Sequence, residues 1–296
     1  MERTNKVQAV LILAHKNLDQ VIELCNTLNP FFNIYIHIDN KCMITTEQKN
    51  KLKNICSYYS NKYNVKWGSY SIVQATIMLM NEALKNKENQ YFHLISGQDW
   101  PLRSPQKIFD YYENSKSIYM NYFKSIDTVK SGENLIWWTR FYFNYDSVNR
   151  RSFFGKIYHR LLINGQRLLN INKLKKFGIK DSYMYSGEEW IDIPRDALEY
   201  VLSEYENKKE LQKVFESSFC SDEMWIQTIL CNSKYKQRID KDTHRYINWK
   251  RKNGSYPAIL DEEDYKKIMK GRYLWGRKFE TPYSDKLREM LFKVNK

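Results

Sequence analysis

Two adjacent carboxylates, Asp222 and Glu223, stand at the start of an apolar segment with the sequence FCSDEMWIQTI. At a helix start such a pair has a structural explanation, because carboxylates cap free backbone N–H groups and favour the positive end of the helix dipole. This explanation suits Asp222 in particular. The apolar surroundings favour a second interpretation, since a partly desolvated carboxylate is a better general base. Neighbours in sequence point in different directions, so only one of the two need face a cleft.

Two cations further along the chain, Arg245 and Lys278, lie in apolar, strand-like pieces with the sequences HRYINW and LWGRKF. A cation held near a core usually meets an anion. That anion is either a carboxylate of the protein, in an internal ion pair, or a bound diphosphate. Arginine can bind phosphate through two hydrogen bonds and lysine acts as a point charge. The sequence leaves both interpretations open.

Support for a metal site is weak. The 5 histidines include no HxxxH or HExxH pair. His37 and Asp39 form an H-x-D at the end of an expected strand, where alternate residues share a face. They either line a pocket together or His37 points into the core. No D-x-D follows this strand, and Asp39 and Asp99 are single carboxylates, so we expect no metal ion and no cofactor.

The elements that must position these residues alternate in type along the first third of the chain. Expected strands cover residues 7–13, 32–39, 63–67 and 91–96, and amphipathic helices follow them, with Asn17 and Thr46 as expected caps. This order predicts βαβ units and a mostly parallel α/β sheet. Ligands bind beyond the carboxyl ends of such strands. The side chains there are candidates for a pocket: His15, Asp39, Trp67 and Asp99.

Two common nucleotide-binding folds are disfavoured, because no GxGxxG follows the first strand and no GxxxxGK[ST] occurs.

The last third of the chain has regular structure again. We expect a strand in EEWIDIP, a helix from Pro194 and further strands in RYINW and YLWGRKF. With no linker or repeat in evidence, we predict one domain over 1–296.

Residues 147–180 contain no acidic residue and nine basic ones. Interspersed apolar residues predict a basic amphipathic helix. This helix either packs on the core with a solvated basic face or contacts an anionic lipid surface or a lipid-linked phosphate. Aromatic and basic residues near this segment and near the C-terminal third suggest acceptor contacts from composition alone: Trp138, Arg140, Tyr142 and Trp249.

The whole chain has a formal net charge of +14. Such a charge suggests an anionic partner, although it also serves solubility. The 5 cysteines form no CxxC pair, and the N-terminal apolar stretch is too short for a signal peptide or a membrane span. We therefore expect reduced thiols and a cytoplasmic protein, at most peripheral to the inner face of a membrane.

Taken in order, these blocks resemble the core-2/I-branching β-1,6-N-acetylglucosaminyltransferase family, which also includes peptide O-xylosyltransferases. The opening VLILAHKNLDQVIELCNTL is similar to the family's first strand and helix, and IYIHID to its second strand. VKWGSYSIVQATIMLMNEAL is similar to its W-x-S-x-V-x-A helix, and YFHLISGQDWPLRS to its (S/C)-G-x-D-(F/Y/W)-P block. SGEEWIDIPRDALEYVL, SDEMWIQTIL, HRYINW and GRKF resemble the later blocks.

The resemblance implies a GT-A type fold, with a Rossmann-like, mostly parallel sheet flanked by helices, that binds a UDP-sugar. It divides the predicted domain into a nucleotide-binding half (1–115) and an acceptor-binding and catalytic half (116–296). It implies an inverting, metal-independent transfer to a sugar hydroxyl with a β linkage. The family's base falls on Glu223, and its diphosphate-binding cations fall on Arg245 and Lys278. Nucleotide contacts at the strand ends match His15, Asp39 and Asp99, with Trp67 nearby.

The expected reaction is transfer of N-acetylglucosamine from UDP-GlcNAc to a glycan or lipid-linked oligosaccharide. UDP-xylose, UDP-glucose and UDP-galactose are alternative donors, because a few pocket contacts set the donor. The lack of an N-terminal anchor and of a disulfide framework fits a bacterial member of the family. A glycosidase is disfavoured because the adjacent carboxylates at 188–189 and 222–223 rarely flank a bond from opposite sides. A basic nucleic-acid or carbohydrate-binding module is the non-enzyme alternative.

Overall fold

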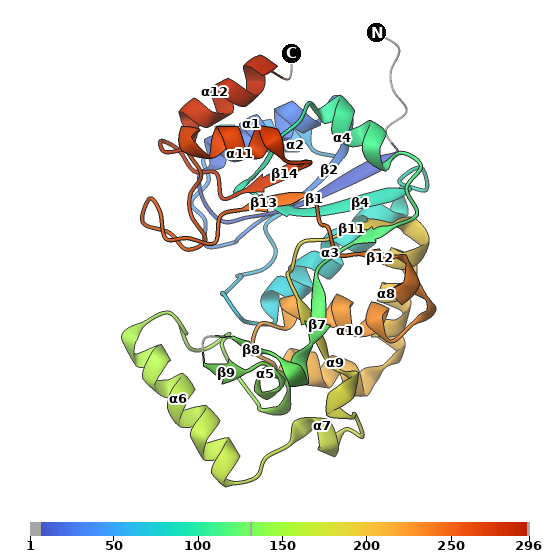
Figure 1. Ribbon diagram of the computed structural model, residues 1–296, viewed down its shortest axis with the longest axis vertical. Coiled ribbons are helices and arrows are strands. Elements are labelled where there is room, and N and C mark those ends of the chain that lie inside the picture. Colours follow the sequence, from blue (N-terminus) through green and yellow to red (C-terminus); the bar gives the residue numbers. More distant parts are fainter. Residues whose placement is uncertain (1–6, 131, 295–296) are drawn as a thin grey trace.

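A seven-stranded sheet forms the centre of the computed structural model, which describes residues 7–130 and 132–294 (Figure 1). Its strands, in spatial order, are β12 (Ile239–Asp240), β6 (Ile118–Tyr119), β11 (Asp192–Pro194), β4 (Tyr91–Ser96), β1 (Gln8–Ala14), β2 (Asn33–Ile38) and β3 (Tyr58–Ser60). Strands β4, β1, β2 and β3 are parallel, and β11 runs antiparallel to both of its neighbours. The expected α/β class with a mostly parallel sheet flanked by helices is confirmed.

Strand β1 shows why this sheet needs helices on both faces. Its side chains alternate, so Ala9 and Leu11 join one hydrophobic cluster while Val10 and Ile12 join another, and all four are buried. The first cluster is covered by α3 (Ser71–Lys85), α8 (Arg195–Asn207), α9 (Lys209–Glu216) and α10 (Trp225–Cys231). The second is covered by α1 (Leu18–Leu28), α2 (Thr46–Ile55), α4 (Pro105–Tyr112), α11 (Tyr265–Lys270) and α12 (Asp285–Val294).

A smaller three-stranded sheet joins distant parts of the chain beside the carboxyl ends of the main strands. It consists of β13 (Arg245–Ile247), β14 (Trp275–Arg277) and β5 (Asp99–Pro101). Strand β14 is antiparallel to β5 and places Arg277 opposite Asp99. The SGQDWP and GRKF blocks therefore meet in space.

The lower part of the molecule in Figure 1 is built from short strands and three helices, one of them the long helix α6, around the first hydrophobic cluster. They are β7 (Tyr122–Lys124), β8 (Val129–Lys130), β9 (Glu133–Asn134), β10 (Tyr185–Gly187), α5 (Ile136–Arg140), α6 (Phe153–Leu168) and α7 (Lys173–Lys176). Single 3-10 turns connect the larger elements: η1 (Ser125–Asp127), η2 (Asp181–Tyr183), η3 (Ser221–Glu223), η4 (Lys234–Arg238) and η5 (Glu262–Asp264). Helix α6 projects along the outer edge (Figure 1).

Several local predictions were wrong. The third strand is β3 at Tyr58–Ser60, not 63–67, which is a loop with no strand assignment. The strand expected over EEWIDIP (188–194) forms only at its end, as β11 (Asp192–Pro194), and 188–191 has no strand assignment. Asn17 makes no side-chain cap bond, and α2 is capped by Thr45 rather than Thr46, in a capping box with Gln48.

The predicted single domain over 1–296 includes residues 1–6, 131 and 295–296, which lie outside the described residues, and it stays a prediction. Its two halves are not separate in space, because β13 and β14 pack on β5 of the first half. All five cysteines are free thiols, as expected. Among the described residues, no helix combines the length and the apolar composition needed to cross a membrane.

Candidate active site

Asp39 lies where β2 ends, beside the end of β1. Its backbone N–H donates to the carbonyl of Ala14 at 2.8 Å, and its carboxylate accepts the backbone N–H groups of Lys41 and Val65 at 3.1 and 3.2 Å. The pKa of His15 is lowered by burial and by Lys16, while Asp39 opposes that shift. Asp39 therefore shapes this edge of the sheet and lies within electrostatic reach of His15, as the sequence predicted for strand-end residues.

His37, the other member of the H-x-D, takes a structural role. Its Nε2 accepts the backbone N–H of Tyr63 at 3.0 Å, and burial lowers its pKa to about 4. A neutral ring that accepts a hydrogen bond suits this position. His37 thus holds the 61–66 loop and does not line a pocket jointly with Asp39.

Asp99 fixes a turn and faces an arginine. Its Oδ2 accepts the backbone N–H of Ser96 and, at 2.6 Å, the Ser96 hydroxyl. Nη1 of Arg277 lies 3.7 Å from the same oxygen, and its guanidinium stacks 4.1 Å from the ring centroid of Trp190. Sequence reasoning missed Arg277, although it directly precedes Lys278; its partner across the small sheet is not visible in the local pattern.

Lys278 belongs to a group of positive side chains from three parts of the chain. Burial, followed by the charges of Arg277, Arg151 and Lys16, lowers its pKa to about 8. Its Nζ donates to the Ser255 hydroxyl at 3.2 Å. We refer to Lys16, Arg151, Arg277 and Lys278 as the cation cluster. Within this cluster Lys16 pairs with Glu280 at 2.7 Å, and Arg277 lies 3.7 Å from the Asp99 carboxylate.

Trp67 and Gly68 connect this cluster to the carboxylates. The Arg151 guanidinium lies 4.7 Å from the centroid of the exposed Trp67 ring, whose other contact is the edge of Phe219 at 5.4 Å. Gly68 has φ +76°, and a Cβ there would lie 2.4 Å from the Phe219 ring. Its carbonyl accepts the backbone N–H of Cys220 at 3.0 Å. The close approach that only glycine permits therefore docks the segment before Glu223 onto this turn.

Glu223 ends the single turn η3. Its Oε2 lies 2.9 Å from Lys130 Nζ, and its side chain is 26% exposed. Asp222 beside it is buried, its Oδ1 has no hydrogen-bond partner, and burial together with the Glu223 charge raises its pKa to about 7. Helix α10 has no side-chain cap bond at its start, so the expected capping role of Asp222 is wrong. Glu223 is the accessible member of the pair.

Two further carboxylates, Glu188 and Glu189, lie within electrostatic reach of both Glu223 and Arg277. Burial raises the pKa of Glu188, and Arg245 and Arg277 oppose this shift. Burial and the charge of Asp222 raise the pKa of Glu189 well above its usual range, and Arg277 again opposes the shift. The 188–189 and 222–223 pairs therefore share one electrostatic environment with Arg277.

Arg245 is buried in an ion pair with Asp192. Its two terminal nitrogens lie 2.6 and 3.0 Å from the two carboxylate oxygens, and His93 Nδ1 lies 2.8 Å from the same carboxylate. Burial opposes the charged form of Arg245, but Asp192 more than offsets this and raises the arginine pKa. The internal ion pair left open by the sequence is present, and contact of Arg245 with a diphosphate stays a prediction.

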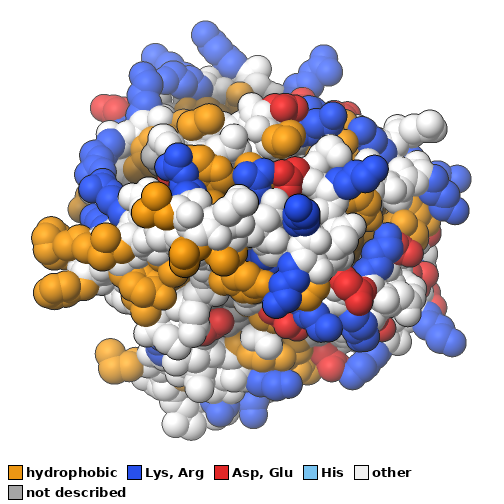
Figure 2. All heavy atoms as spheres, turned by 90° about the horizontal axis from the view of Figure 1, so that it is seen from below, with side chains coloured by type: hydrophobic (Ala, Val, Ile, Leu, Met, Phe, Trp, Pro, Cys, Tyr) orange, Lys and Arg blue, Asp and Glu red, His pale blue; other side chains and the backbone are white. Residues whose placement is uncertain are grey.

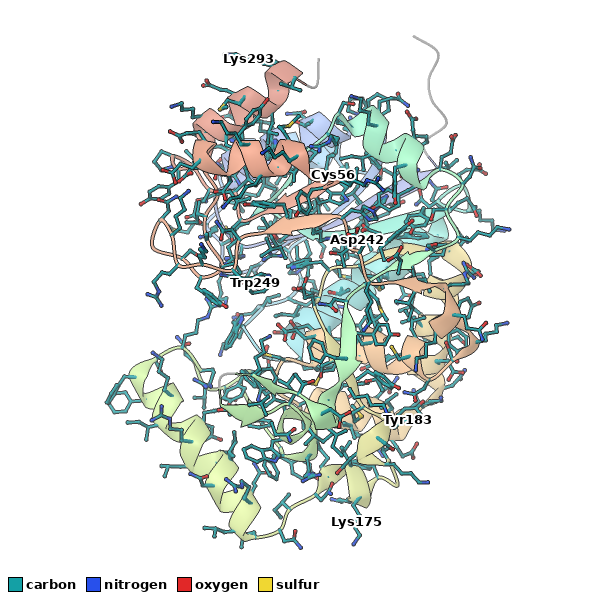
Figure 3. All side chains as sticks on the ribbon, viewed as in Figure 1. Cys56, Lys175, Tyr183, Asp242, Trp249 and Lys293 are labelled. Atoms are coloured by element: carbon teal, nitrogen blue, oxygen red, sulfur yellow. The ribbon has the colours of Figure 1, made fainter. Side chains whose placement is uncertain are left out.

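The residues suggested for acceptor contacts are dispersed. Trp138 is buried, and its Nε1 donates to Glu133 at 2.8 Å, which disfavours the suggested acceptor contact; that contact stays a prediction. Arg140 pairs with Asp181, and the Tyr142 ring lies beside Lys173. Trp249 is exposed and lies at the rim of the upper part in Figure 3, facing the lower part.

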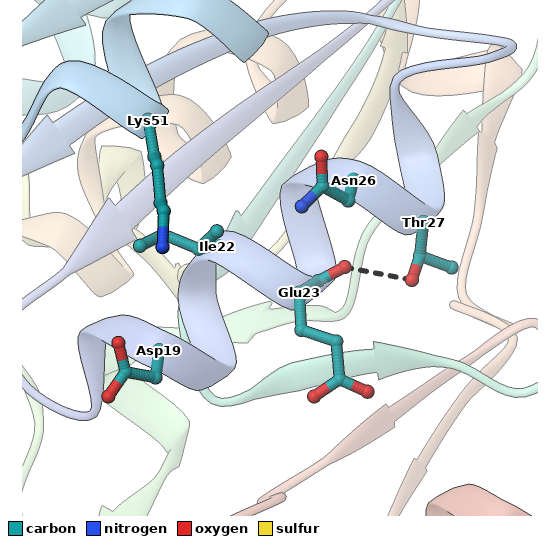
Figure 4. Close-up of a pocket in the computed structure, with 6 residues that line it drawn as sticks. All are labelled: Asp19, Ile22, Glu23, Asn26, Thr27 and Lys51. Atoms are coloured by element: carbon teal, nitrogen blue, oxygen red, sulfur yellow. Dashed lines mark hydrogen bonds between the residues drawn. The ribbon is translucent and has the colours of Figure 1, made fainter. Parts of the chain in front are cut away.

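One hollow on the surface lies away from these residues. It runs along the outer side of α1, as Figure 4 shows, and is lined by Asp19, Ile22, Glu23, Asn26, Thr27 and Lys51. None of them belongs to the cation cluster or lies near Glu223 in the chain. Across residues 7–130 and 132–294, no group of three or more His, Cys, Asp or Glu side chains is placed to hold a metal ion.

The family model of the Core-2/I-Branching enzyme matches residues 11–269. The chain is 26% identical over 265 residues to xylosyltransferase sqv-6 of Caenorhabditis briggsae, which covers 87% of this chain and 30% of that protein. It is 21% identical over 262 residues to xylosyltransferase sqv-6 of Caenorhabditis elegans, which covers 86% and 30% respectively. The chain thus spans 30% of the length of these curated relatives.

Solved structures show a distant likeness. Core-mannan synthase A from Aspergillus fumigatus superposes with a TM-score of 0.39 at 11% identity, covering 81% of this chain and 73% of that one. The WbbM bifunctional glycosyltransferase superposes with a TM-score of 0.38 at 11% identity, covering 95% and 47%.

Proposed function

We propose, because this chain belongs to the Core-2/I-branching enzyme family, that it transfers a sugar from a UDP-sugar to a hydroxyl group of a glycan, with inversion at the anomeric carbon. The observation that supports this most is the cation cluster: three segments bring Lys16, Arg151, Arg277 and Lys278 together. Four cations paired with two carboxylates, Glu280 and Asp99, keep an excess of positive charge, which suits a diphosphate.

Glu223 is the proposed general base. An inverting displacement needs one group to take the proton of the acceptor hydroxyl while its oxygen attacks the anomeric carbon. The Glu223 carboxylate is accessible and is oriented by Lys130 at 2.9 Å. Its buried neighbour Asp222, with a pKa of about 7, is a poorer candidate because an acceptor has no direct path to it.

The cation cluster is proposed to stabilise the departing UDP. Negative charge grows on the leaving diphosphate, and fixed cations stabilise it without reorganising. Arg277 is held by Asp99 and Trp190, and Arg151 is held on Trp67, so both guanidinium groups are positioned in advance. Lys278 lies beyond the matched family residues, and its proposed part depends on its place beside these cations.

Two donors deserve the first tests. Family resemblance favours UDP-GlcNAc. The two Caenorhabditis relatives are named xylosyltransferases, which favours UDP-xylose. UDP-glucose and UDP-galactose remain alternatives. UDP release measured across these four donors, with and without glycan acceptors, identifies the sugar.

The test of the base is Glu223→Gln. We expect UDP binding to be retained and sugar transfer to fall by about a hundredfold or more, because the amide cannot accept the proton. Calorimetry with UDP and a transfer assay with the donor identified above measure the two effects. Glu210→Gln, the same change at an exposed site on α9, is the matched control and should transfer normally. Near-normal turnover of Glu223→Gln would show that Glu223 is not the general base.

The non-enzyme alternative, a basic nucleic-acid or carbohydrate-binding module, has the net charge of +14 in its favour. A thermal shift assay separates it from the transferase. We expect UDP to stabilise the protein. Stabilisation by single-stranded DNA and none by UDP would favour the binding module.

A further inference from the structure

Helix α6 presents an apolar stripe to the outside of the molecule. Phe154, Ile157, Leu161 and Leu168 are spaced by three, four and seven residues, which places them on one side of a helix. Their counterparts on the opposite side are buried against the body of the protein: Gly155, His159, Ile163 and Gln166. The stripe therefore faces away from the core that the helix packs on.

The inward face holds this orientation firmly. His159 lies 2.8 Å from Glu133 through its Nε2. The Gln166 side chain accepts the N–H of Tyr142 at 2.8 Å and donates to the Tyr142 carbonyl at 2.9 Å. At Gly155 a Cβ would lie 1.9 Å from the carbonyl oxygen of Asn149, so that helix turn is in direct backbone contact with the preceding loop. The outward stripe is thus a consequence of the packing.

The exposure of the stripe is high for large apolar side chains. Phe154 is 80% exposed, Leu161 68% and Leu168 87%. Phe153 and Leu169, at the two ends of α6, extend the same surface. Figure 2, seen from below the view of Figure 1, shows apolar side chains projecting at the left edge, the side on which α6 lies in Figure 1. Isolated exposed apolar residues are ordinary, but a contiguous row indicates a contact surface.

Positive charge accompanies the stripe. Lys156, Arg160 and Arg167 are exposed along one flank of α6, and residues 147–180 contain no acidic residue. A row of apolar side chains beside a row of cations is complementary to the lipid–water boundary of an anionic bilayer. It suits a second copy of this chain less well, because two such helices would bring cations together with no carboxylate in the segment to pair them.

We propose that α6 lies in the surface of an anionic lipid bilayer, with its outward stripe inserted at headgroup level and its basic flank against the lipid phosphates. The site of chemistry would then lie close to the bilayer. Arg151, a member of the cation cluster, lies two residues before the start of α6 and stacks on Trp67. Bilayer binding does not depend on which sugar the enzyme transfers or on whether it transfers one.

Vesicle co-sedimentation tests the proposal. We expect the protein to sediment with vesicles of phosphatidylcholine and phosphatidylglycerol, to stay in solution with phosphatidylcholine alone, and to be released by added salt. The double variant F154Q/L161Q should bind anionic vesicles at least about tenfold more weakly, since both side chains lose their apolar contact. K156E/R160E should lose binding by a similar factor.

Matched controls lie on other surfaces. M43Q removes an exposed apolar side chain outside α6, and K49E/K53E reverses two charges four residues apart on α2; both should bind as the unaltered protein does. Circular dichroism and thermal melting establish that each variant is folded. Equal binding by F154Q/L161Q, or no binding of the unaltered protein to anionic vesicles, overturns the proposal. A dimer in light scattering that F154Q/L161Q converts to a monomer, with vesicles ignored, would assign the stripe to a second copy instead.

Discussion

Arg245 and Lys278 carry the same charge in different surroundings. Arg245 is buried and bound through two hydrogen bonds to Asp192. Lys278 lies among other cations, and its pKa is lowered to about 8 by burial and by those charges. Arg245 is thus paired with an anion of the protein, whereas no anion near Lys278 is strong enough to keep the pKa of this lysine at its usual value. A bound diphosphate would supply that anion.

Alanine at the two positions should therefore have different effects. Lys278→Ala should weaken UDP binding about tenfold with little change in stability, because a charge-assisted contact is lost at a site open to ligand. Arg245→Ala should lower the free energy of unfolding by about 3–5 kcal/mol, because it leaves the Asp192 carboxylate buried and unpaired. Calorimetry with UDP and denaturant unfolding measure the two quantities.

The control for this comparison is Lys270→Ala, at an exposed lysine near the end of α11. It should leave both quantities unchanged. If Lys278→Ala binds UDP with the affinity of the unaltered protein, the cation cluster is not the diphosphate site.

Asp222 should make stability fall as pH rises. Burial and the Glu223 charge raise its pKa from 3.8 to about 7 in the folded protein, so the folded state holds this proton more tightly than the unfolded state does. The free energy of unfolding then decreases between about pH 4 and about pH 7. Asp222→Asn removes this dependence and should be more stable than the unaltered protein at about pH 8, by on the order of 2 kcal/mol.

Denaturant midpoints at about pH 5 and about pH 8 measure this effect. Asp110→Asn, the same change at an exposed aspartate on α4, should leave the pH dependence as it is. A parallel pH dependence in Asp222→Asn and the unaltered protein would show that Asp222 titrates normally.

At the scale of elements, prediction from the local sequence pattern was correct where the composition of a segment alone determines whether it forms a strand or a helix. Strands β1, β2 and β4 are continuous apolar runs, and a strand buried on both faces requires that composition. Helix α6 was predicted from its apolar and basic pattern. The third strand was misplaced, because the pairing partner decides it: Tyr58–Ser60 pairs with β2, while the 63–67 loop is held by hydrogen bonds to His37 and Asp39.

The candidate site was predicted in part for the same reason. Strand-end residues such as Asp39 and Asp99 follow from topology, since the carboxyl ends of parallel strands share an edge. The place of Arg277 follows from the pairing of β14 with β5, and the contact of Gly68 with Phe219 depends on a close approach across the fold. Neither contact can be predicted from the sequence around the residues that make it.

At the scale of the whole molecule, the excess basic side chains gather in at least two places. Part of it lies in the cation cluster beside the carboxyl ends of the main strands. Another part lies along α6 and the segment around it, 147–180. Arg151 belongs to both groups and lies two residues before the start of α6. A net charge of +14 is thus explained by two proposed anionic partners, a diphosphate and a lipid surface, without nucleic acid.

The division of charge at the site also predicts how the enzyme responds to chelators. The leaving diphosphate needs positive charge, supplied either by a divalent ion on carboxylates or by fixed side chains. The cation cluster consists of fixed side chains that could supply this charge. We therefore expect sugar transfer to continue at an unchanged rate in EDTA, measured as UDP release with the identified donor.

Loss of activity in EDTA with recovery on adding manganese would contradict this, and would mean that carboxylates such as Asp99 and Glu189 bind an ion when the donor is present. Lys278→Ala sharpens the comparison: if the lysine serves in place of a metal, manganese should not restore the transfer that this variant loses.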